Sequence, residues 1–250
     1  LPWYTNATPR GGGTLRAPSP TEIELQIPGL TLAARVHGPP GGRPVLALHG
    51  WLDSAASFER LAPLLPGDLR LVCLDLPGHG RSQHRHRSAT YDFVYWIPDV
   101  LAAADALGWD RFALLGHSMG AAVAICCAGT APARVQRAVL IDGLGPLVAE
   151  AHEAPARLAA AIGDRRQRLT QRPYVHRDEA MAAAWLCKAI AGLTEPAARV
   201  LASRGLRPEG EGVTWRHDLR LRGRSLLRLT EDQVLRSEEH TSELQSLLII

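Results

Sequence analysis

The sequence predicts an α/β protein whose central, mostly parallel sheet has helices on both faces. Strand-like runs alternate with helical segments through short connections as far as residue 142, and this order favours a parallel sheet. The runs RPVLALHG, DLRLVCLDL and RFALLG are nearly continuous apolar sequences, as expected for strands buried on both faces. The 250 residues are 46% hydrophobic and 21% charged, which suits one domain with a substantial core.

The first elements precede this alternation. Residues 1–20 are rich in Gly, Pro, Ser and Thr, and we expect them to be flexible. The runs TEIELQI and LTLAARV flank Pro28-Gly29 and predict a hairpin, because apolar and polar residues alternate in both. Residues 54–65 then have helical spacing, with Asp53 or Ser54 available as the N-cap.

Two longer helices are predicted between the later strands. One covers residues 91–107, although Pro98 interrupts its pattern, and the other covers residues 120–129, where small residues dominate. The run VQRAVLIDG ends the alternation as a strand. Because ligands bind beyond the carboxyl ends of parallel strands, motifs that directly follow strands are expected at one edge of the sheet.

After Gly145 the sequence becomes rich in alanine and arginine, and its pattern becomes helical. Three helices are predicted, over residues 148–172, 177–193 and 196–205. GVTWRHDLRL is compatible with a short extended piece, and TEDQVLR begins with a capping box of Thr230 and Gln233. We therefore predict a core over residues 21–145 and a helical cap over residues 146–235.

The motif GHSMG, residues 116–120, places Ser118 between a predicted strand and a small-residue helix. Side chains two positions before and after the serine would collide across a sharp turn, which accounts for Gly116 and Gly120. Such a nucleophile elbow exposes the hydroxyl and predicts Ser118 as the nucleophile. The plainer alternative is a serine that caps a helix.

A second motif, LALHGWLDSAASF, follows the first parallel strand. A carbonyl that becomes a tetrahedral oxyanion needs two preorganised donors. We predict the backbone N–H groups of Trp51 and Met119 as these donors, forming an oxyanion hole. His49 is interpreted as a buried histidine that shapes the turn, and the Trp51 ring as a pocket wall.

A third motif, DLPGHGRS, supplies glycines for a tight loop in which Asp75 is expected to brace the backbone. These motifs, in this order and spacing, resemble the α/β-hydrolase family over residues 22–142. HGWLDSAASFERLAPLLP and YWIPDV resemble in particular its serine hydrolase-like proteins. The resemblance implies an α/β-hydrolase fold with a helical cap and hydrolysis of an ester-like or other small acyl substrate. Members that open epoxides or remove halides use a carboxylate nucleophile, and the serine at position 118 argues against both reactions.

A serine nucleophile needs a histidine base, and the histidine needs an acid that fixes its tautomer. In this family the acid and then the histidine follow strands beyond the cap. We predict no such strands after Leu221 and find no histidine in the expected place, so the last core strands and the general base are expected to be missing. Asp142, after the strand AVLID, is a possible alternative acid; an aspartate that caps the next turn is equally compatible.

The C-terminal string RSEEHTSELQS resembles one reading frame of a translated sequencing adapter. We therefore expect residues 236–250 to be a non-native tail on a truncated fragment, which would be inactive or weakly active where the parent protein is active. The alternative is an amphipathic C-terminal helix, because Leu244, Leu247 and Leu248 have helical spacing.

Composition limits the partners and cofactors. The net charge of +3 is too small to indicate a nucleic-acid partner, and the sequence offers no basic groove lined with aromatic residues. No stretch of sequence is long and apolar enough to span a membrane. The four cysteines lack metal-ligand spacing and indicate free thiols. We expect no metal and no organic cofactor. The expected location is the cytoplasm, or else an organelle lumen such as the peroxisome, and the oligomeric state is not predicted.

Two functions remain open from the sequence. The first is a serine hydrolase that acts on small ester or related acyl substrates through an acyl-Ser118 intermediate. The second is a non-catalytic module that binds a small molecule on the same fold. Trp185 and the many Ala and Leu residues of the cap favour an apolar pocket roof, and hence an uncharged or acyl-chain substrate.

Overall fold

The computed structural model describes residues 20–241 and 246–249. Seven strands form one sheet in the order β1-β2-β4-β3-β5-β6-β9. The hairpin predicted around residue 29 is confirmed: β1 (Thr21–Ile27) pairs antiparallel with β2 (Leu30–His37), and Gly29 has a φ of 76° in the turn. The prediction of flexibility for residues 1–20 lies outside the described residues, apart from Pro20.

The rest of the sheet is parallel, apart from the antiparallel pairing of β2 with β4. Its parallel strands are β3 (Arg43–Leu48), β4 (Leu69–Leu74), β5 (Phe112–His117), β6 (Val135–Ile141) and β9 (Ser246–Ile249). Successive side chains point to opposite faces, so each strand contributes to two cores. Leu46, Leu48 and Leu74 lie in the larger core, whereas Ala47 and Cys73 lie in the smaller one.

Helices α1 (Trp96–Ala106) and α2 (Met119–Thr130) cover the face of the larger core. Pro98 does not interrupt α1, because the helix begins at Trp96 and the proline lies in its first turn, where a backbone N–H has no intrahelical partner. The opposite face is covered by the 3-10 helices η1 (Ala55–Phe58) and η2 (Ala62–Leu64). The helical spacing of residues 54–65 therefore produces two short helices instead of one.

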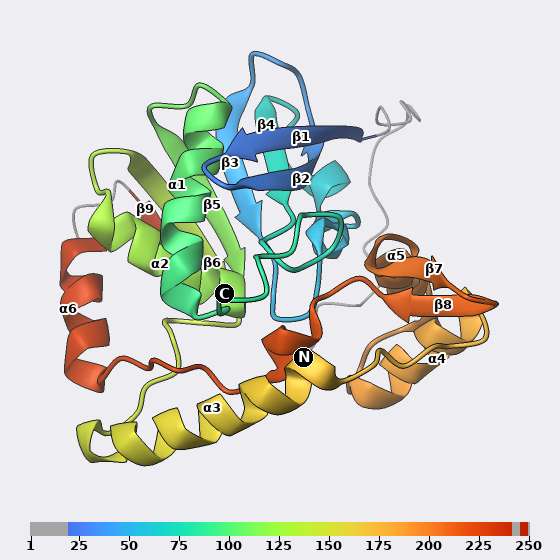
Figure 1. Ribbon diagram of the computed structural model, residues 1–250. Coiled ribbons are helices and arrows are strands. Elements are labelled where there is room, and N and C mark those ends of the chain that lie inside the picture. The colour runs from blue at the N-terminus through green and yellow to red at the C-terminus, as the bar shows by residue number, and fades with distance from the viewer. Residues whose placement is uncertain (1–19, 242–245, 250) are drawn as a thin grey trace.

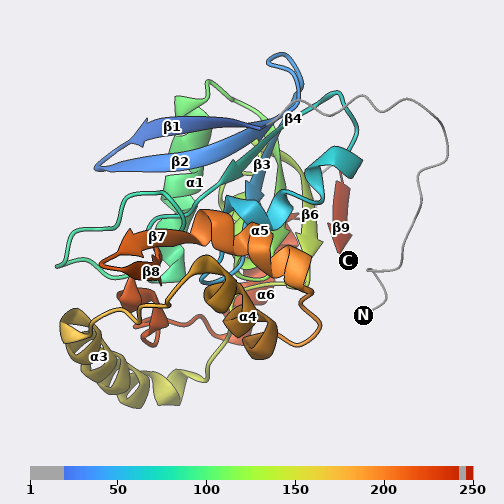
Figure 2. The same ribbon diagram turned by 90° about the vertical axis from the view of Figure 1, so that its right-hand side faces the viewer.

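The cap combines helices with a small hairpin (Figure 2). Its elements are η4 (Ala151–Glu153), α3 (Ala154–Thr170), α4 (Glu179–Ala189), α5 (Glu195–Gly205), β7 (Leu206–Glu209), β8 (Gly212–Trp215) and η5 (Leu219–Arg222). The extended piece expected in GVTWRHDLRL is β8, which pairs antiparallel with β7. Helices α4 and α5 pack through Ala182, Ala183, Ala198 and Ala202, where small side chains allow close contact.

The C-terminal residues extend the fold, contrary to the prediction that no core strand follows the cap. Helix α6 (Glu231–Thr241) begins at the predicted capping box, in which the Thr230 N–H donates to Gln233 Oε1 at 2.9 Å and the Gln233 N–H to Thr230 Oγ1 at 3.4 Å. Helix α6 crosses the expected boundary at residue 235 and packs beside α2 (Figure 1). Residues 246–249 form β9, parallel to β6, because an apolar run can pair with an open sheet edge. The predicted helical spacing over Leu247 and Leu248 is therefore replaced by a strand.

Candidate active site

Four parallel strands end at the same edge of the sheet, and a polar residue directly follows each of them. His49 follows β3, Asp75 follows β4, Ser118 follows β5 and Asp142 follows β6. Because β4, β3, β5 and β6 are neighbours and parallel, their carboxyl ends meet at one edge. The edge thus gathers a serine, a histidine and two carboxylates.

Ser118 lies in a sharp turn from β5 to α2. Its φ of 50° and ψ of −115° are a strained conformation for a non-glycine residue, which costs on the order of 1–3 kcal/mol. The turn is held by hydrogen bonds from the Ser118 N–H to the Ile141 carbonyl and from the Ala121 N–H to the Ser118 carbonyl, both 2.9 Å. The half-buried Ser118 side chain makes no capping hydrogen bond, so a helix cap does not account for this conformation.

The glycines on either side of Ser118 allow three chain segments to approach one another. A Cβ on Gly116 would lie 2.5 Å from both the Gly120 carbonyl oxygen and the Ala121 Cα. A Cβ on Gly120 would lie 2.0 Å from the carbonyl oxygen of Leu48, at the end of β3. Any larger residue at either position would therefore push the elbow away from the sheet.

The turn after β3 lies directly against this elbow. A Cβ on Gly50 would come within 3.5 Å of the Ser118 Cβ and 3.1 Å of His117 Nδ1. The next residue is Trp51, whose backbone N–H, like that of Met119, donates to no backbone carbonyl of the described residues. Two amides that lie beside the serine are thus free to bind an oxygen atom.

His49 and His79 shape this edge as neutral side chains. His49 is fully buried, and its Nε2 accepts a hydrogen bond from the Leu76 N–H at 3.0 Å. The contact of its Nδ1 with the Gly50 carbonyl, at 2.7 Å, then requires the proton on Nδ1. Burial lowers the pKa of both histidines, and their rings meet edge to face at 4.9 Å. His49 therefore organises the turn.

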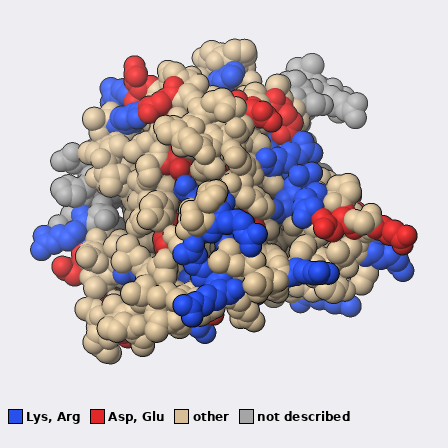
Figure 3. Space-filling model, viewed as in Figure 1, with Lys and Arg blue, Asp and Glu red and all other residues tan. Residues whose placement is uncertain are grey.

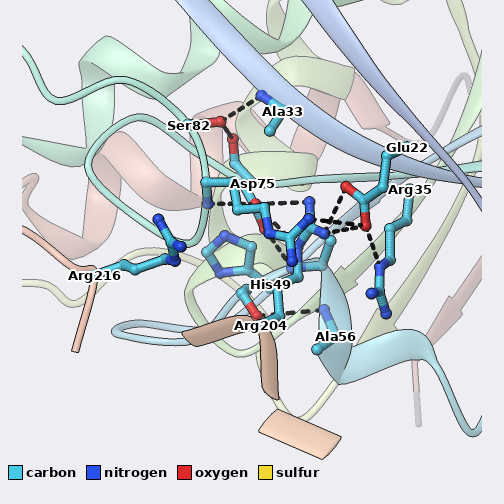
Figure 4. A network of polar contacts seen from close by, with 12 residues as sticks. Glu22, Ala33, Arg35, His49, Ala56, Asp75, Ser82, Arg204 and Arg216 are labelled. Atoms are coloured by element: carbon cyan, nitrogen blue, oxygen red, sulfur yellow. Dashed lines mark hydrogen bonds and ion pairs between the residues drawn. The ribbon is translucent and has the colours of Figure 1, made fainter. Parts of the chain in front are cut away.

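Asp75 is fully buried and connects three parts of the fold (Figure 4). Its carboxylate accepts hydrogen bonds from the backbone N–H groups of Ala55 and Arg81, both at 2.7 Å, which is the bracing role expected from the sequence. It also forms an ion pair with Arg204 of α5, with 2.9 Å between Nη2 and Oδ2. The same guanidinium binds Glu22 of β1 at 2.5 Å. Arg204 was not among the predicted residues, because nothing in the local sequence of α5 indicates a partner 129 positions away.

No histidine completes a triad within the described part of the chain. Asp142 is exposed and has a φ of 53°, and no described histidine hydrogen-bonds to its carboxylate or to the Ser118 hydroxyl. The His117 ring lies against Gly50, where its Nδ1 would be 3.1 Å from a Cβ on that glycine, and no described hydrogen bond joins it to Ser118. The side chain of His240 lies outside the described part. The described part of the chain thus presents a candidate nucleophile and two free amides, with no histidine hydrogen-bonded to them.

The segment between β8 and α6 joins the cap to this edge. The Asp218 N–H donates to the Gly78 carbonyl at 2.8 Å, and the Tyr91 hydroxyl donates to Asp218 Oδ2 at 3.0 Å. The Trp51 indole N–H donates to the Leu221 carbonyl at 2.9 Å, although 53% of the Trp51 residue is exposed. The ring of Trp51 thus connects the turn after β3 to η5.

Two further observations concern other kinds of site. Among residues 20–241 and 246–249, no cluster of three or more His, Cys, Asp or Glu side chains could hold a metal ion.

A cavity of about 740 Å³ lies at the opposite end of the sheet, where Pro39, Pro63 and Leu69 line it. We do not assign this cavity to the chemistry, because Leu69 begins β4 whereas Ser118 follows the carboxyl end of β5. Over the same ranges, no helix has the length and apolar character needed to cross a bilayer.

The comparison with protein families agrees with this architecture. The sequence pattern of the alpha/beta hydrolase fold family matches residues 43–224, which include the elbow, the turn after β3 and most of the cap. The chain therefore belongs to the α/β-hydrolase family.

Within this family the chain is similar to serine hydrolase-like proteins. It is 34% identical over 221 residues to a serine hydrolase-like protein of Danio rerio, with 86% of this chain and 67% of the relative covered. It is 33% identical over 226 residues to a probable serine hydrolase of Drosophila melanogaster, with 86% and 66% covered. The chain thus spans about two thirds of the length of both relatives. The crystal structure of a hypothetical protein from Pseudomonas aeruginosa superposes with a TM-score of 0.86 at 44% identity, covering 90% of this chain and 80% of that one.

Proposed function

We propose that this chain carries the nucleophile and the oxyanion hole of a serine hydrolase that acts on small ester or related acyl substrates. The observation that supports this most directly is the strained turn at Ser118, with the free amides of Trp51 and Met119 on the adjoining backbone. Backbone strain of this kind persists where the surrounding structure enforces it, as at catalytic sites. The names of the relatives in zebrafish and fruit fly point to the same chemistry.

In the proposed reaction, Ser118 Oγ attacks the carbonyl carbon of the substrate and transfers its proton to a base. The N–H groups of Trp51 and Met119 stabilise the oxyanion of the tetrahedral intermediate. Collapse of the intermediate breaks the bond to the leaving alcohol, which takes up the proton and leaves an acyl-Ser118 ester. A water molecule then hydrolyses this ester and regenerates the hydroxyl.

The general base is proposed to be a histidine outside the described residues, with Asp142 as a candidate acid. Without a base, an oxyanion hole and a binding site retain a rate acceleration of about 10³–10⁴ over water in dismantled serine proteases. We therefore expect weak or no turnover from the 250-residue chain by itself. Activity measurements accordingly use the full-length protein.

Labelling with a fluorophosphonate probe tests the role of Ser118. The full-length protein should be labelled, the variant Ser118→Ala should not, and Ser203→Ala should be labelled like the wild type. Ser203 is a suitable control because its exposed hydroxyl bonds only to the Val200 carbonyl of its own helix. Labelling that survives Ser118→Ala would remove this serine as the nucleophile. A folded full-length protein that binds esters but is never labelled would favour the non-catalytic binding module.

A further inference from the structure

Helix η5 carries an arginine directly after the residue that contacts Trp51. The hydrogen bond from the Trp51 indole to the Leu221 carbonyl fixes η5 above the turn that adjoins Ser118. Arg222 is the next residue and the last of η5. Figure 1 shows η5 between the carboxyl end of the sheet and α3. Arg222 thus adjoins the point at which the cap contacts the ring of Trp51, the residue whose backbone N–H is proposed for the oxyanion hole.

Arg222 has no counterion among the described residues. It is half-buried, its Nε is buried without an acceptor, and its guanidinium makes no described hydrogen bond or ion pair. Burial and the positive charge of Arg168 lower its pKa, and no carboxylate opposes them. The nearby carboxylates are already engaged, because Asp218 pairs with Arg220 and Asp164 pairs with Arg224.

Arg168 faces Arg222 from α3 and is also without an acid. Its Nη1 donates to Gln171 Oε1 at 2.6 Å, and its Nε is buried without an acceptor. Basic side chains gather on the face where η5 meets α3, as Figure 3 shows. Two half-buried guanidinium groups that repel each other are unfavourable by themselves. Their planar donor groups are, however, suited to a carboxylate or a phosphate, which would satisfy both charges.

We propose that Arg222 and Arg168 bind an anionic oxyacid group of the substrate, so that Ser118 acts on an ester that carries a carboxylate or a phosphate. This inference rests on the proposed hydrolase function and names its substrate class. It replaces the uncharged substrate expected from Trp185. That residue lies on α4 with 45% of its surface exposed, and its ring is 6.2 Å from that of His176 in the cap.

Binding to a variant that cannot turn over the ligand tests the proposal independently of catalysis. Full-length Ser118→Ala is titrated calorimetrically with the monomethyl and dimethyl esters of succinate, glutarate and adipate, and with methyl 4-phosphonobutyrate. At least one monoanionic ester should bind tenfold or more tightly than its neutral diester, because hydrogen bonds to charged groups are individually strong. The tighter of the carboxylate and phosphonate ligands identifies the group. Equal binding of charged and neutral esters would overturn the proposal.

Substitutions assign the preference to the two arginines. Adding Arg222→Met or Arg168→Met to Ser118→Ala should reduce the preference to less than threefold, whereas Arg222→Lys should keep part of it. Arg224→Met is the matched control and should keep all of it, because 61% of that side chain is exposed and it pairs with Asp164 at 3.5 Å. A preference that survives both methionine substitutions contradicts the proposal.

Two further readouts separate the possible failures. The thermal midpoint of Arg222→Met should equal or exceed that of the wild type, since an unpaired, half-buried cation is removed. A large fall would make the arginine structural and contradict the proposal. Fluorophosphonate labelling of the wild type reports on Ser118 alone. If the protein is labelled but Ser118→Ala binds charged and neutral esters equally, only the anionic substrate class is rejected. If the protein is not labelled but Ser118→Ala prefers anionic esters, only the proposed catalysis by Ser118 is rejected.

Discussion

At the scale of single residues, the conformation of Ser118 depends on Gly116 and Gly120, because a side chain at either position would collide with neighbouring backbone. A Cβ on Gly120 would lie 2.0 Å from the Leu48 carbonyl oxygen, which is backbone and cannot move aside. We expect Gly120→Ala to lower the free energy of unfolding by about 3 kcal/mol, because overpacking a tight contact shifts the backbone. Urea unfolding followed by circular dichroism measures this effect.

Gly163 in α3 is the matched control for this substitution. No atom lies within 4 Å of its Cβ position, and Ala is a better helix former than Gly. Gly163→Ala should therefore raise the stability by about 0.5–1 kcal/mol. If Gly120→Ala behaved like Gly163→Ala, the close contact between α2 and β3 would not exist in solution.

His217 provides a pH-dependent contribution to stability. Burial, together with the charges of Arg222 and His84, lowers its pKa to about 4, compared with an ordinary value of 6.5. The unfolded chain therefore binds this proton more readily between about pH 4 and pH 6.5, so the free energy of unfolding rises with pH through this window and levels off above it. A difference of about 2.5 pKa units corresponds to roughly 3 kcal/mol.

The variant His217→Gln should lose this part of the pH dependence. Its stability curve between pH 4.5 and 7.5 should be flatter than that of the wild type, and the exposed His152, changed to Gln, is the control. Urea midpoints measured across this range make the comparison. In Arg222→Met, NMR titration should give a higher His217 pKa, because a neighbouring cation is removed. An unchanged pKa would place Arg222 away from His217.

At the scale of elements, one arginine attaches the cap to the core. Arg204 lies in the last turn of α5, and its fully buried side chain binds Asp75 after β4 and Glu22 in β1. Removing one partner of a buried ion pair leaves the other charge without compensation, which costs about 3–5 kcal/mol. We expect Arg204→Met to lose stability by this amount and to make the cap more sensitive to limited proteolysis.

Arg199→Met on the same helix is the control for Arg204. Its side chain is 56% exposed and pairs with Glu195 one turn away, so its loss should cost less than about 0.5 kcal/mol. Arg204→Lys keeps the charge but loses the forked geometry and should fall between the two. Equal stability of the methionine variants at positions 204 and 199 would show that Arg204 does not hold the cap.

The elements that sequence patterns located correctly are those with a local signal. The hairpin at Gly29, the buried strands and the turn at Ser118 all follow from apolar runs and glycine positions. By contrast, the ion pair of Arg204 with Asp75 joins residues 129 positions apart, and no period or motif encodes such a distance. The prediction that Pro98 interrupts a helix was wrong, because the effect of a proline depends on where the helix begins, and α1 begins only two residues before it. Local backbone features such as the turn at Ser118 were thus more predictable than the long-range contacts that hold them in place.

At the scale of the whole molecule, the candidate site is assembled from the core and the cap. The core contains Ser118 and the amides beside it, whereas the proposed anion-binding residues Arg222 and Arg168 belong to the cap. Substitutions in the cap should therefore change the choice of substrate, and substitutions at the elbow should change the rate for every substrate. On the proposed reading, motifs in the core indicate the reaction, whereas the proposed substrate class depends on side chains brought together where η5 and α3 meet.

Strand β9 forms the edge of the sheet next to β6. Strand β9 covers β6 through pairs from Arg137 with Ser246 to Leu140 with Ile249. Deleting residues 246–250 should expose the backbone groups of β6, lower the free energy of unfolding by on the order of 1 kcal/mol and promote self-association. Light scattering as a function of concentration and urea unfolding measure both effects. A truncated chain that stays monomeric with an unchanged midpoint would show that β9 does not protect this edge, and residues 246–250 would then behave as part of the dispensable tail that their sequence suggests.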